Sequence, residues 1–176
     1  MISVNIWTQP QIITCIMQVI LGKVCCVAEP PKSKRRSGCP VSISLEMLGD
    51  RWSLLVIRDL MVRGFRTFKQ FQGSGEGIAT NILGDRLRKL EAAGIITAAV
   101  EQADRRRVSY RLTEKGIDLA SVLLELLIWG ARHERTGASC ALIASMEKNR
   151  EQVLAEVRRR WRERGRQPAR TAQSSS

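Results

Sequence analysis

The chain has 176 residues, of which 29 are Lys or Arg and 17 are Asp or Glu, so its net charge at neutral pH is +12. This length predicts one domain of ordinary size with an arm at either end. This excess of basic over acidic residues favours a phosphate-rich partner or an anionic membrane. However, residues 1–38, 39–150 and 151–176 each contribute +4. Net charge alone therefore does not identify a nucleic-acid-binding domain.

The cysteines form no recognisable metal or disulfide pattern. There are five of them, none in a Cys-x-x-Cys pair, and His133 is the one histidine. Because the count is odd and the spacing irregular, we expect neither a zinc site nor a disulfide framework. The interpretation is reduced thiols in a cytoplasmic protein that carries no metal and no cofactor. The cysteines are Cys15, Cys25, Cys26, Cys39 and Cys140.

Residues 1–38 are expected to be a poorly ordered extension that ends in a basic linker. The stretch 4–27 is largely apolar, but Lys23 interrupts it and no basic residue precedes it, so we expect neither a membrane span nor a secretion signal. Residues 30–38 are basic and rich in helix breakers. The extension is either natural or the product of a start codon assigned too far upstream.

Helical periodicity begins near residue 41 and predicts helices at about 41–49 and 51–63. A third, short helix follows, with Thr67 as its N-cap. Large apolar residues at these spacings are interpreted as core. Among them are Met47, Trp52 and, further along the chain, Trp129.

Residues 79–93 are the expected recognition helix, because their wheel separates an apolar from a polar side. Leu83, Leu87 and Leu90 converge on one side. The opposite side carries Asn81, Gly84, Asp85, Arg88 and Lys89. The alternative is that this polar side is only exposed to solvent and does not bind DNA. The elements that follow in the sequence decide between these two interpretations.

A hairpin follows this helix directly. Residues 95–101 are rich in strand formers, residues 108–112 alternate, and an arginine-rich turn at about 103–107 joins them. A major groove about 12 Å wide admits one helix, while a neighbouring hairpin can touch phosphate or the minor groove. The order of helix and hairpin therefore indicates a winged helix that reads duplex DNA.

The candidate DNA contacts are polar side chains at the helix start and cations on the helix and wing. Arg88 suits a bidentate contact to guanine or a phosphate. Asp85 would repel phosphate unless it orients Arg88 or accepts from a cytosine amine. One or two wing arginines are expected to reach DNA and another to pair with Asp104 or Glu101. The predicted DNA-binding set is Thr80, Asn81, Arg88, Lys89, Arg105, Arg106 and Arg107.

The C-terminal third is predicted to be helical. Thr113 is a plausible N-cap, and an apolar stripe over 119–129 is too hydrophobic to be solvated in a small monomer. Residues 136–165 repeat apolar positions among arginines and glutamates, which predicts one amphipathic helix that binds a partner or a second copy. Residues 166–176 are expected to be a disordered tail.

Several motifs together resemble the HxlR-type family of bacterial transcription regulators. They are Cys39-Pro-Val, Leu48-Gly-Asp-Arg-Trp-Ser-Leu-Leu-Val-Ile-Arg-Asp-Leu, Gly77-Ile-Ala-Thr-Asn-Ile-Leu, Tyr110-Arg-Leu-Thr-Glu-Lys-Gly and Trp129-Gly-x-x-His. The resemblance covers 39–135 and implies a winged helix-turn-helix, mainly α with a small β-hairpin wing (an α+β class), with additional N- and C-terminal dimerisation helices. It also implies a homodimer on double-stranded DNA with a palindromic operator. Family members repress or activate, and some respond to oxidants or electrophiles through the cysteine at the start of the first helix, which here is Cys39.

Two residues depart from the family pattern. Many relatives have Ser where this chain has Ala79, so Thr80 is expected to cap the recognition helix instead. Gly84 in the middle of that helix costs about 1 kcal/mol relative to Ala. Both changes are expected to leave the recognition helix less rigid.

Two single residues have competing interpretations. A predicted helix N-terminus and nearby basic residues favour the thiolate of Cys39, which is either a sensor of oxidants or electrophiles or a half-buried thiol without a regulatory role. His133 stands without a nucleophile or carboxylate constellation, so no enzyme is predicted. The alternative to a sequence-specific regulator is a non-specific nucleic-acid-binding protein that acts through its basic arms.

Overall fold

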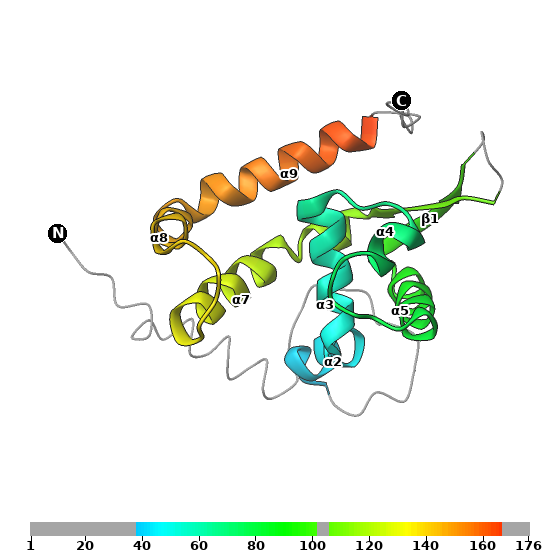
Figure 1. Ribbon diagram of the computed structural model, residues 1–176, viewed down its shortest axis with the longest axis horizontal. Helices are drawn as coiled ribbons and strands as arrows, with labels where there is room; N and C mark the ends of the chain where they lie inside the picture. Colours follow the sequence, from blue (N-terminus) through cyan, green and yellow to red (C-terminus); the bar gives the residue numbers. More distant parts are fainter. Residues whose placement is uncertain (1–37, 102–105, 167–176) are drawn as a thin grey trace. The chain divides into compact units, whose positions relative to one another are not determined.

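The computed structural model describes residues 38–101 and 106–166 (Figure 1). By its internal contacts the chain divides into two units, residues 1–50 and 51–176. The described part of the first unit is helix α2 (Pro40–Leu48), with Cys39 as its N-cap and Gly49 as its C-cap. The predicted extension and linker up to residue 37, the wing tip at 102–105 and the tail from 167 lie outside the described residues.

The second unit begins with a helix that changes its winding. Helix α3 (Arg51–Arg58) continues as the π-helical turn η2 (Asp59–Arg63), and the chain leaves it at Gly64 with φ 71°. Glycine suits this left-handed position because it has no Cβ. The predicted span of 51–63 is confirmed, but its last turn is wider than an α-helix.

A short helix and a long helix follow and form the helix-turn-helix. Helix α4 (Phe68–Gln72) has Thr67 as its N-cap, as predicted, and the Gln70 side chain accepts from the Thr67 backbone N–H at 3.0 Å. Helix α5 (Thr80–Ala92) matches the predicted recognition helix, and its end is followed by Gly94 with φ 67°.

The predicted hairpin is also present. Strands β1 (Ile96–Val100) and β2 (Val108–Leu112) pair antiparallel, from Ile96 opposite Leu112 to Val100 opposite Val108. The turn into the next helix approaches this hairpin closely, because a Cβ on Gly116 would collide with the carbonyl oxygen of Ile95. The glycine of the Tyr-Arg-Leu-Thr-Glu-Lys-Gly motif is therefore a packing requirement.

Four helices complete the described chain: α6 (Glu114–Ile117), α7 (Ala120–His133), α8 (Cys140–Lys148) and α9 (Arg150–Arg166). Where the sequence predicts one helix over 136–165, there are two. They are separated by Asn149, whose φ of −115° and ψ of 37° are not helical. The Asn149 side chain and backbone N–H both donate to the Ser145 carbonyl at 3.0 Å. An asparagine that satisfies a terminal carbonyl in this way competes with helix continuation.

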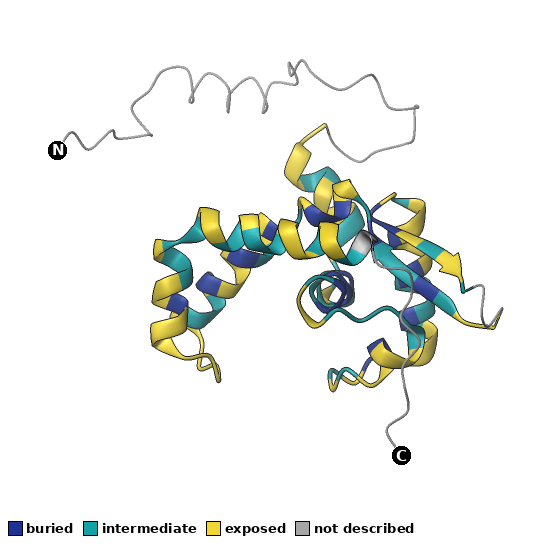
Figure 2. Ribbon diagram, turned by 90° about the horizontal axis from the view of Figure 1, so that it is seen from above, coloured by how far each residue is buried: buried dark blue, intermediate teal, exposed yellow. Residues whose placement is uncertain are grey.

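The hydrophobic core lies among α3, η2, α4, α5 and the hairpin (Figure 2). Helix α7 buries one row of side chains, and α9 buries none of those described. The interpretation of Trp129 as core is wrong, because 59% of its surface is exposed, while Trp52 and Met47 are half-buried. The fully buried large apolar residues are Ile57, Leu60, Phe71, Leu83, Leu87, Leu90, Ile95, Ile96 and Ile128.

Candidate nucleic-acid interface

Helix α5 is held in the core by the three leucines that the wheel places on its inner side. Leu83, Leu87 and Leu90 are at most 2% exposed. Gly84 is not required by close packing, because a Cβ there would meet nothing nearer than the Phe68 ring at 4.0 Å. The buried leucines orient α5 so that its polar side is presented outward.

The N-terminus of α5 differs from the prediction. Ala79 occupies the N-cap and provides no side-chain hydrogen bond, and Thr80 is the first helical residue, so Thr80 does not cap the helix. The Thr80 hydroxyl instead accepts from Gln72 Nε2 at 2.9 Å, which ties α5 to α4. Thr80 and Asn81 are both exposed. The helix start therefore offers two polar side chains to a ligand at the cost of an unfilled cap.

Asp85 is surrounded by cations. Its carboxylate lies 3.1 Å from Lys89 Nζ, 3.5 Å from Arg86 and 3.8 Å from Arg88. The hydrogen bond from Lys89 is the main cause that lowers the pKa of Asp85. Its negative charge is thus compensated within the helix, in keeping with an orienting role rather than repulsion of DNA.

Arg88 is the most exposed cation of this group. Its side chain is 78% exposed, and its Nε donates to the Gly84 carbonyl at 3.3 Å. The guanidinium is therefore directed along the outer side of α5 while most of its donors remain available to a ligand. Such a fork suits a guanine edge or a phosphate.

A polar network that the sequence does not predict supports the turn before α5. Asp59, 3% exposed, accepts from Arg58 Nε and Nη2 at 2.9 and 2.7 Å. Arg58 also contacts Glu76 at 3.0 Å, and Arg63 donates to the Ser74 carbonyl at 2.9 Å. Through these bonds Arg58 of α3 and Arg63 of η2 hold the turn that leads to the recognition helix.

One signal for this network was present in the sequence. Asp59 lies on the apolar side of a predicted helix, and buried carboxylates are normally paired. Its flanking arginines could therefore have been assigned to it. Glu76 could not, because only the folded chain brings that turn against η2.

The wing is described on both sides of its tip. Arg106 and Arg107 are exposed, and Arg107 pairs with Glu101 at 3.9 Å, which is one of the two pairings predicted for a wing arginine. Arg105 and Asp104 lie outside the described residues.

Two residues away from this surface carried hypotheses. Cys39 is exposed at the N-cap of α2. His133 lies at the end of α7 with its ring 5.1 Å from that of Trp129, which agrees with a packing role. Within the described residues no group of three or more His, Cys, Asp or Glu side chains could hold a metal ion. None of the described helices is both long and apolar enough to cross a membrane.

A two-helix turn, an outward-facing second helix and a two-stranded wing define a winged helix-turn-helix DNA-binding protein. The HxlR-like helix-turn-helix family model matches residues 47–137, more than half of the chain. The protein belongs to this family, as its motifs predict. Relatives of this chain are named as HTH-type transcriptional regulators.

Relatives of the same description occur in several bacteria. The HTH-type transcriptional regulator Rv3095 of Mycobacterium tuberculosis is 38% identical over 98 residues, which cover 56% of this chain and 61% of the relative. YybR of Bacillus subtilis, also named as an HTH-type transcriptional regulator, is 33% identical over 95 residues, 54% of this chain and 75% of the relative. The chain thus spans less than two thirds of the mycobacterial protein.

Two solved structures share the fold. PA1607, described as a candidate transcription factor, is 36% identical with a TM-score of 0.53, covering 60% of this chain and 72% of that one. The oxidised form of the redox regulator HypR is 30% identical with a TM-score of 0.50, covering 56% of this chain and 100% of that one. Helix α9 lies beyond the region that matches the family model.

Proposed function

We propose that the protein binds a palindromic operator as a homodimer and regulates transcription by occupying it. Each copy places α5 in a major groove and its wing on phosphate or the minor groove, with the two helices about one turn of DNA apart. The observation that carries this proposal is α5 itself, with its buried leucines inside and exposed Thr80, Asn81, Arg88 and Lys89 outside.

The homodimer is supported by the uncovered side of α7. Its residues Val122, Leu126 and Trp129, spaced at i, i+4 and i+7, are between 44 and 59% exposed. Contiguous apolar side chains on a small protein mark an interaction site. A second copy supplies the same side chains, so two α7 helices bury one another's apolar side around a two-fold axis.

Operator selection tests the proposal. Library selection of DNA bound by the purified full chain is expected to yield a palindrome with two half-sites one turn apart. Removing 1–38 and 166–176 should leave this selectivity intact. If instead the trimmed protein loses all DNA binding, or the full chain selects no sequence, the protein is the non-specific binder that acts through its basic arms.

Arg88→Ala tests the base-reading role of α5. Loss of a bidentate base contact should weaken operator binding by about 1 to 3 kcal/mol and affect random DNA much less. Arg159→Ala is the control, because Glu156 and Glu163 already hold that guanidinium. Equal losses on both DNAs would remove the base-reading role.

Arg106→Ala tests the wing. If Arg106 contacts a phosphate, the slope of log affinity against log salt should fall by about one. An unchanged slope would exclude that contact. Arg107→Ala is the comparison, because Arg107 is engaged by Glu101.

Redox or electrophile control through Cys39 is a second part of the proposal. It is supported by the exposure of Cys39 at a helix start and by the likeness to the redox regulator HypR. Oxidation or an electrophile should change operator affinity in the native protein and not in Cys39→Ser. Cys140→Ser is the matched control, since Cys140 is also exposed at the start of a helix. A response that survives Cys39→Ser would exclude this sensor.

We also propose that the protein binds chromosomal DNA in the cytoplasm.

A further inference from the structure

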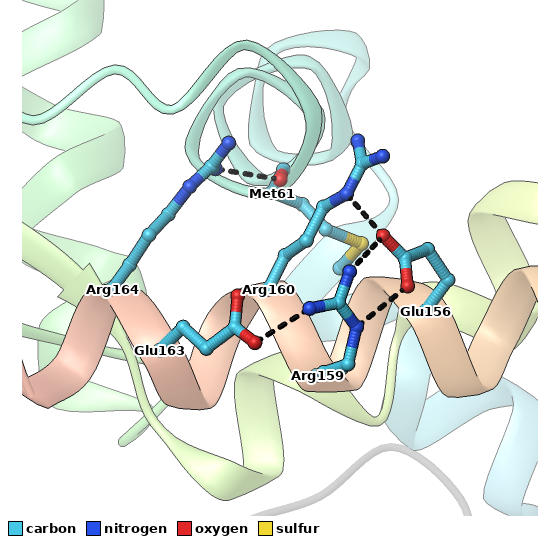
Figure 3. A network of polar contacts seen from close by, with 6 residues as sticks. All are labelled: Met61, Glu156, Arg159, Arg160, Glu163 and Arg164. Atoms are coloured by element: carbon cyan, nitrogen blue, oxygen red, sulfur yellow. Dashed lines mark hydrogen bonds and ion pairs between the residues drawn. The ribbon is translucent and has the colours of Figure 1, made fainter.

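Helix α9 returns to the winged-helix region instead of extending away from it. The Trp161 indole donates to the Leu112 carbonyl of β2 at 3.0 Å. Arg164 Nη1 donates to the Met61 carbonyl of η2 at 3.2 Å (Figure 3). The C-terminal part of α9 thus contacts β2 and η2, and Figure 1 shows α9 and α5 on opposite sides of the hairpin. These bonds give that end of α9 a defined position next to the wing.

The arginines of α9 fall into two groups. Those up to residue 160 form ion pairs: Arg150 with Glu125, Arg158 with Asp118, Arg159 with Glu156 and Glu163, and Arg160 with Glu156. Arg162 and Arg164 form no ion pair with a described residue; Arg162 is exposed, whereas Arg164 is half-buried and donates to a neutral carbonyl of η2 (Figure 3). Positive charge therefore remains uncompensated where α9 meets the wing.

Arg164 has cationic neighbours from two other elements. Its guanidinium lies over Gly64, where a Cβ would be 3.1 Å from Nη1. Arg66 follows two residues later, and its carbonyl accepts from the Tyr110 N–H at 2.7 Å, which places it beside Arg111 of β2. The three arginines thus gather where η2, β2 and α9 meet.

The environment of Arg66 is electrostatically unfavourable. It is half-buried and has no carboxylate among the described residues within ion-pair distance. Burial, together with repulsion from Arg164 and Arg111, lowers the pKa of Arg66. A partly desolvated cation without a counterion is unfavourable, and an anion that binds between the guanidinium groups relieves that cost.

We propose that Arg66, Arg111 and Arg164 form a binding site for a phosphodiester group of bound DNA, next to the wing. Guanidinium forks match phosphate oxygens. The site lies towards the base of the hairpin, where Arg111 pairs with Thr97, and so adds a contact separate from the one predicted at the wing tip. This inference rests on the proposed function in that the wing approaches the duplex. It assigns α9 a role as an added DNA contact.

Arg66→Gln and Arg164→Gln, made separately in the full chain, test the site. One lost phosphate contact should lower the salt slope by about one and weaken binding about five- to tenfold at 0.1 M salt. The loss should be equal on operator and on random duplex, because a phosphate carries no sequence information. Arg159→Gln, on the same helix but held by two glutamates, should change neither quantity.

Two outcomes would overturn the proposal. One is an unchanged slope and affinity in both variants; the other is a loss confined to the operator. The random duplex keeps the test independent of the proposed function, since it gives a result even if no operator is selected. Arg164→Lys guards against a folding defect: it retains the charge, and it should retain most of the salt slope.

Free phosphate is the other source of the same chemistry. The unfolding temperature is measured in inorganic phosphate and in chloride at equal ionic strength, for the native protein and for Arg164→Gln. If phosphate stabilises only the native protein while DNA binding is identical in both, the site holds a free anion and the DNA assignment is wrong. Loss of DNA binding in the variant supports the assignment whether or not free phosphate also binds.

Discussion

The region from α3 to β2 and the region from α7 to α9 are held together by different forces. In the first, side chains from every helix and both strands meet in a core whose central leucines are inaccessible to water. In the second, α7 buries one row of side chains, α8 buries Ile143 and α9 buries none of its described side chains. Helix α9 is instead fixed by hydrogen bonds and ion pairs. The winged-helix region therefore has a closed core within one chain, whereas the C-terminal region leaves large apolar side chains of α7 exposed.

The helices show the origin of this contrast. Helix α5 has one apolar side and one polar side, so a single packed face satisfies it. Helix α7 is apolar over most of its circumference, and its own chain covers only the row of Ala120, Leu124 and Ile128. An apolar helix that is half covered is suited to an interface.

The sharpest test of the contrast is Leu87→Ala. Truncating a leucine inside the core should reduce the free energy of unfolding by about 2 to 5 kcal/mol, because it leaves a cavity as well as losing buried area. Urea unfolding measures this. Leu127→Ala in α7, 45% exposed, is the matched control and should cost much less when the protein is diluted to monomer. Similar losses at both positions would mean that the two regions are not held differently.

The next largest effect is expected on formation of the proposed homodimer. Replacing Leu126 and Trp129 together by Ser should raise the dimer dissociation constant by at least about thirtyfold, the equivalent of one hot-spot residue. Sedimentation velocity over a concentration series measures it. Val62→Ser is the control, because Val62 is also an exposed apolar residue, at 65%, but lies on η2. A dimer that persists unchanged in the double variant would rule out α7 as the interface.

A smaller effect is expected where α9 meets β2. Trp161→Phe keeps the packing and removes the indole donor to Leu112, so the free energy of unfolding should fall by about 1 kcal/mol. Chemical denaturation measures it. Trp129→Phe is the comparison, because Trp129 donates no hydrogen bond to another described residue. Its free energy of unfolding is measured at a protein concentration low enough for the chain to be monomeric. No difference between the two variants would show that the polar anchor of α9 contributes nothing.

The smallest effect concerns the ion pairs on the surface of α9. Hydrogen bonds from Arg159 and Arg160 lower the pKa of Glu156 from 4.5 to about 2. Because the pKa is lower in the folded state, the stabilisation is present above about pH 4.5 and is lost as the pH falls towards 2. The unfolding temperature of Glu156→Gln should therefore approach that of the native protein as the pH is lowered through this range.

The matched variant for this test is Glu151→Gln. Glu151 is exposed on the same helix and forms no ion pair with a described residue. Its difference from the native protein should not vary over the same pH range. Parallel pH profiles for Glu156→Gln and the native protein would contradict the assignment.

Much of the DNA-reading region was predictable because its signals are local. The inner row of Leu83, Leu87 and Leu90 follows from the helical repeat, and the hairpin follows from strand formers around a turn. The orienting role of Asp85 was one of two alternatives, and the contacts to Lys89 and Arg88 favour it.

The features that escaped prediction all depend on partners distant in the sequence. Asp59 and Glu76 are joined through Arg58, and Trp161 bonds to Leu112, 49 residues away. Helical periodicity also assigned Trp129 to the core, since a repeat identifies an apolar side but not whether the same chain covers it. The prediction placed the N-cap of α5 at Thr80, one residue too late, because Ala79 occupies the N-cap without a side-chain hydrogen bond.

The sequence by itself determined the family, the order of helices and strands, and the side of α5 that faces outward. Each of these follows from residues close together in the chain. Only the tertiary structure decided that α7 keeps an exposed apolar side, that α9 docks on the wing, and that Arg66, Arg111 and Arg164 gather around Gly64. Burial and charge clustering depend on which elements meet in space, and the local repeat of a helix contains no information about its neighbours.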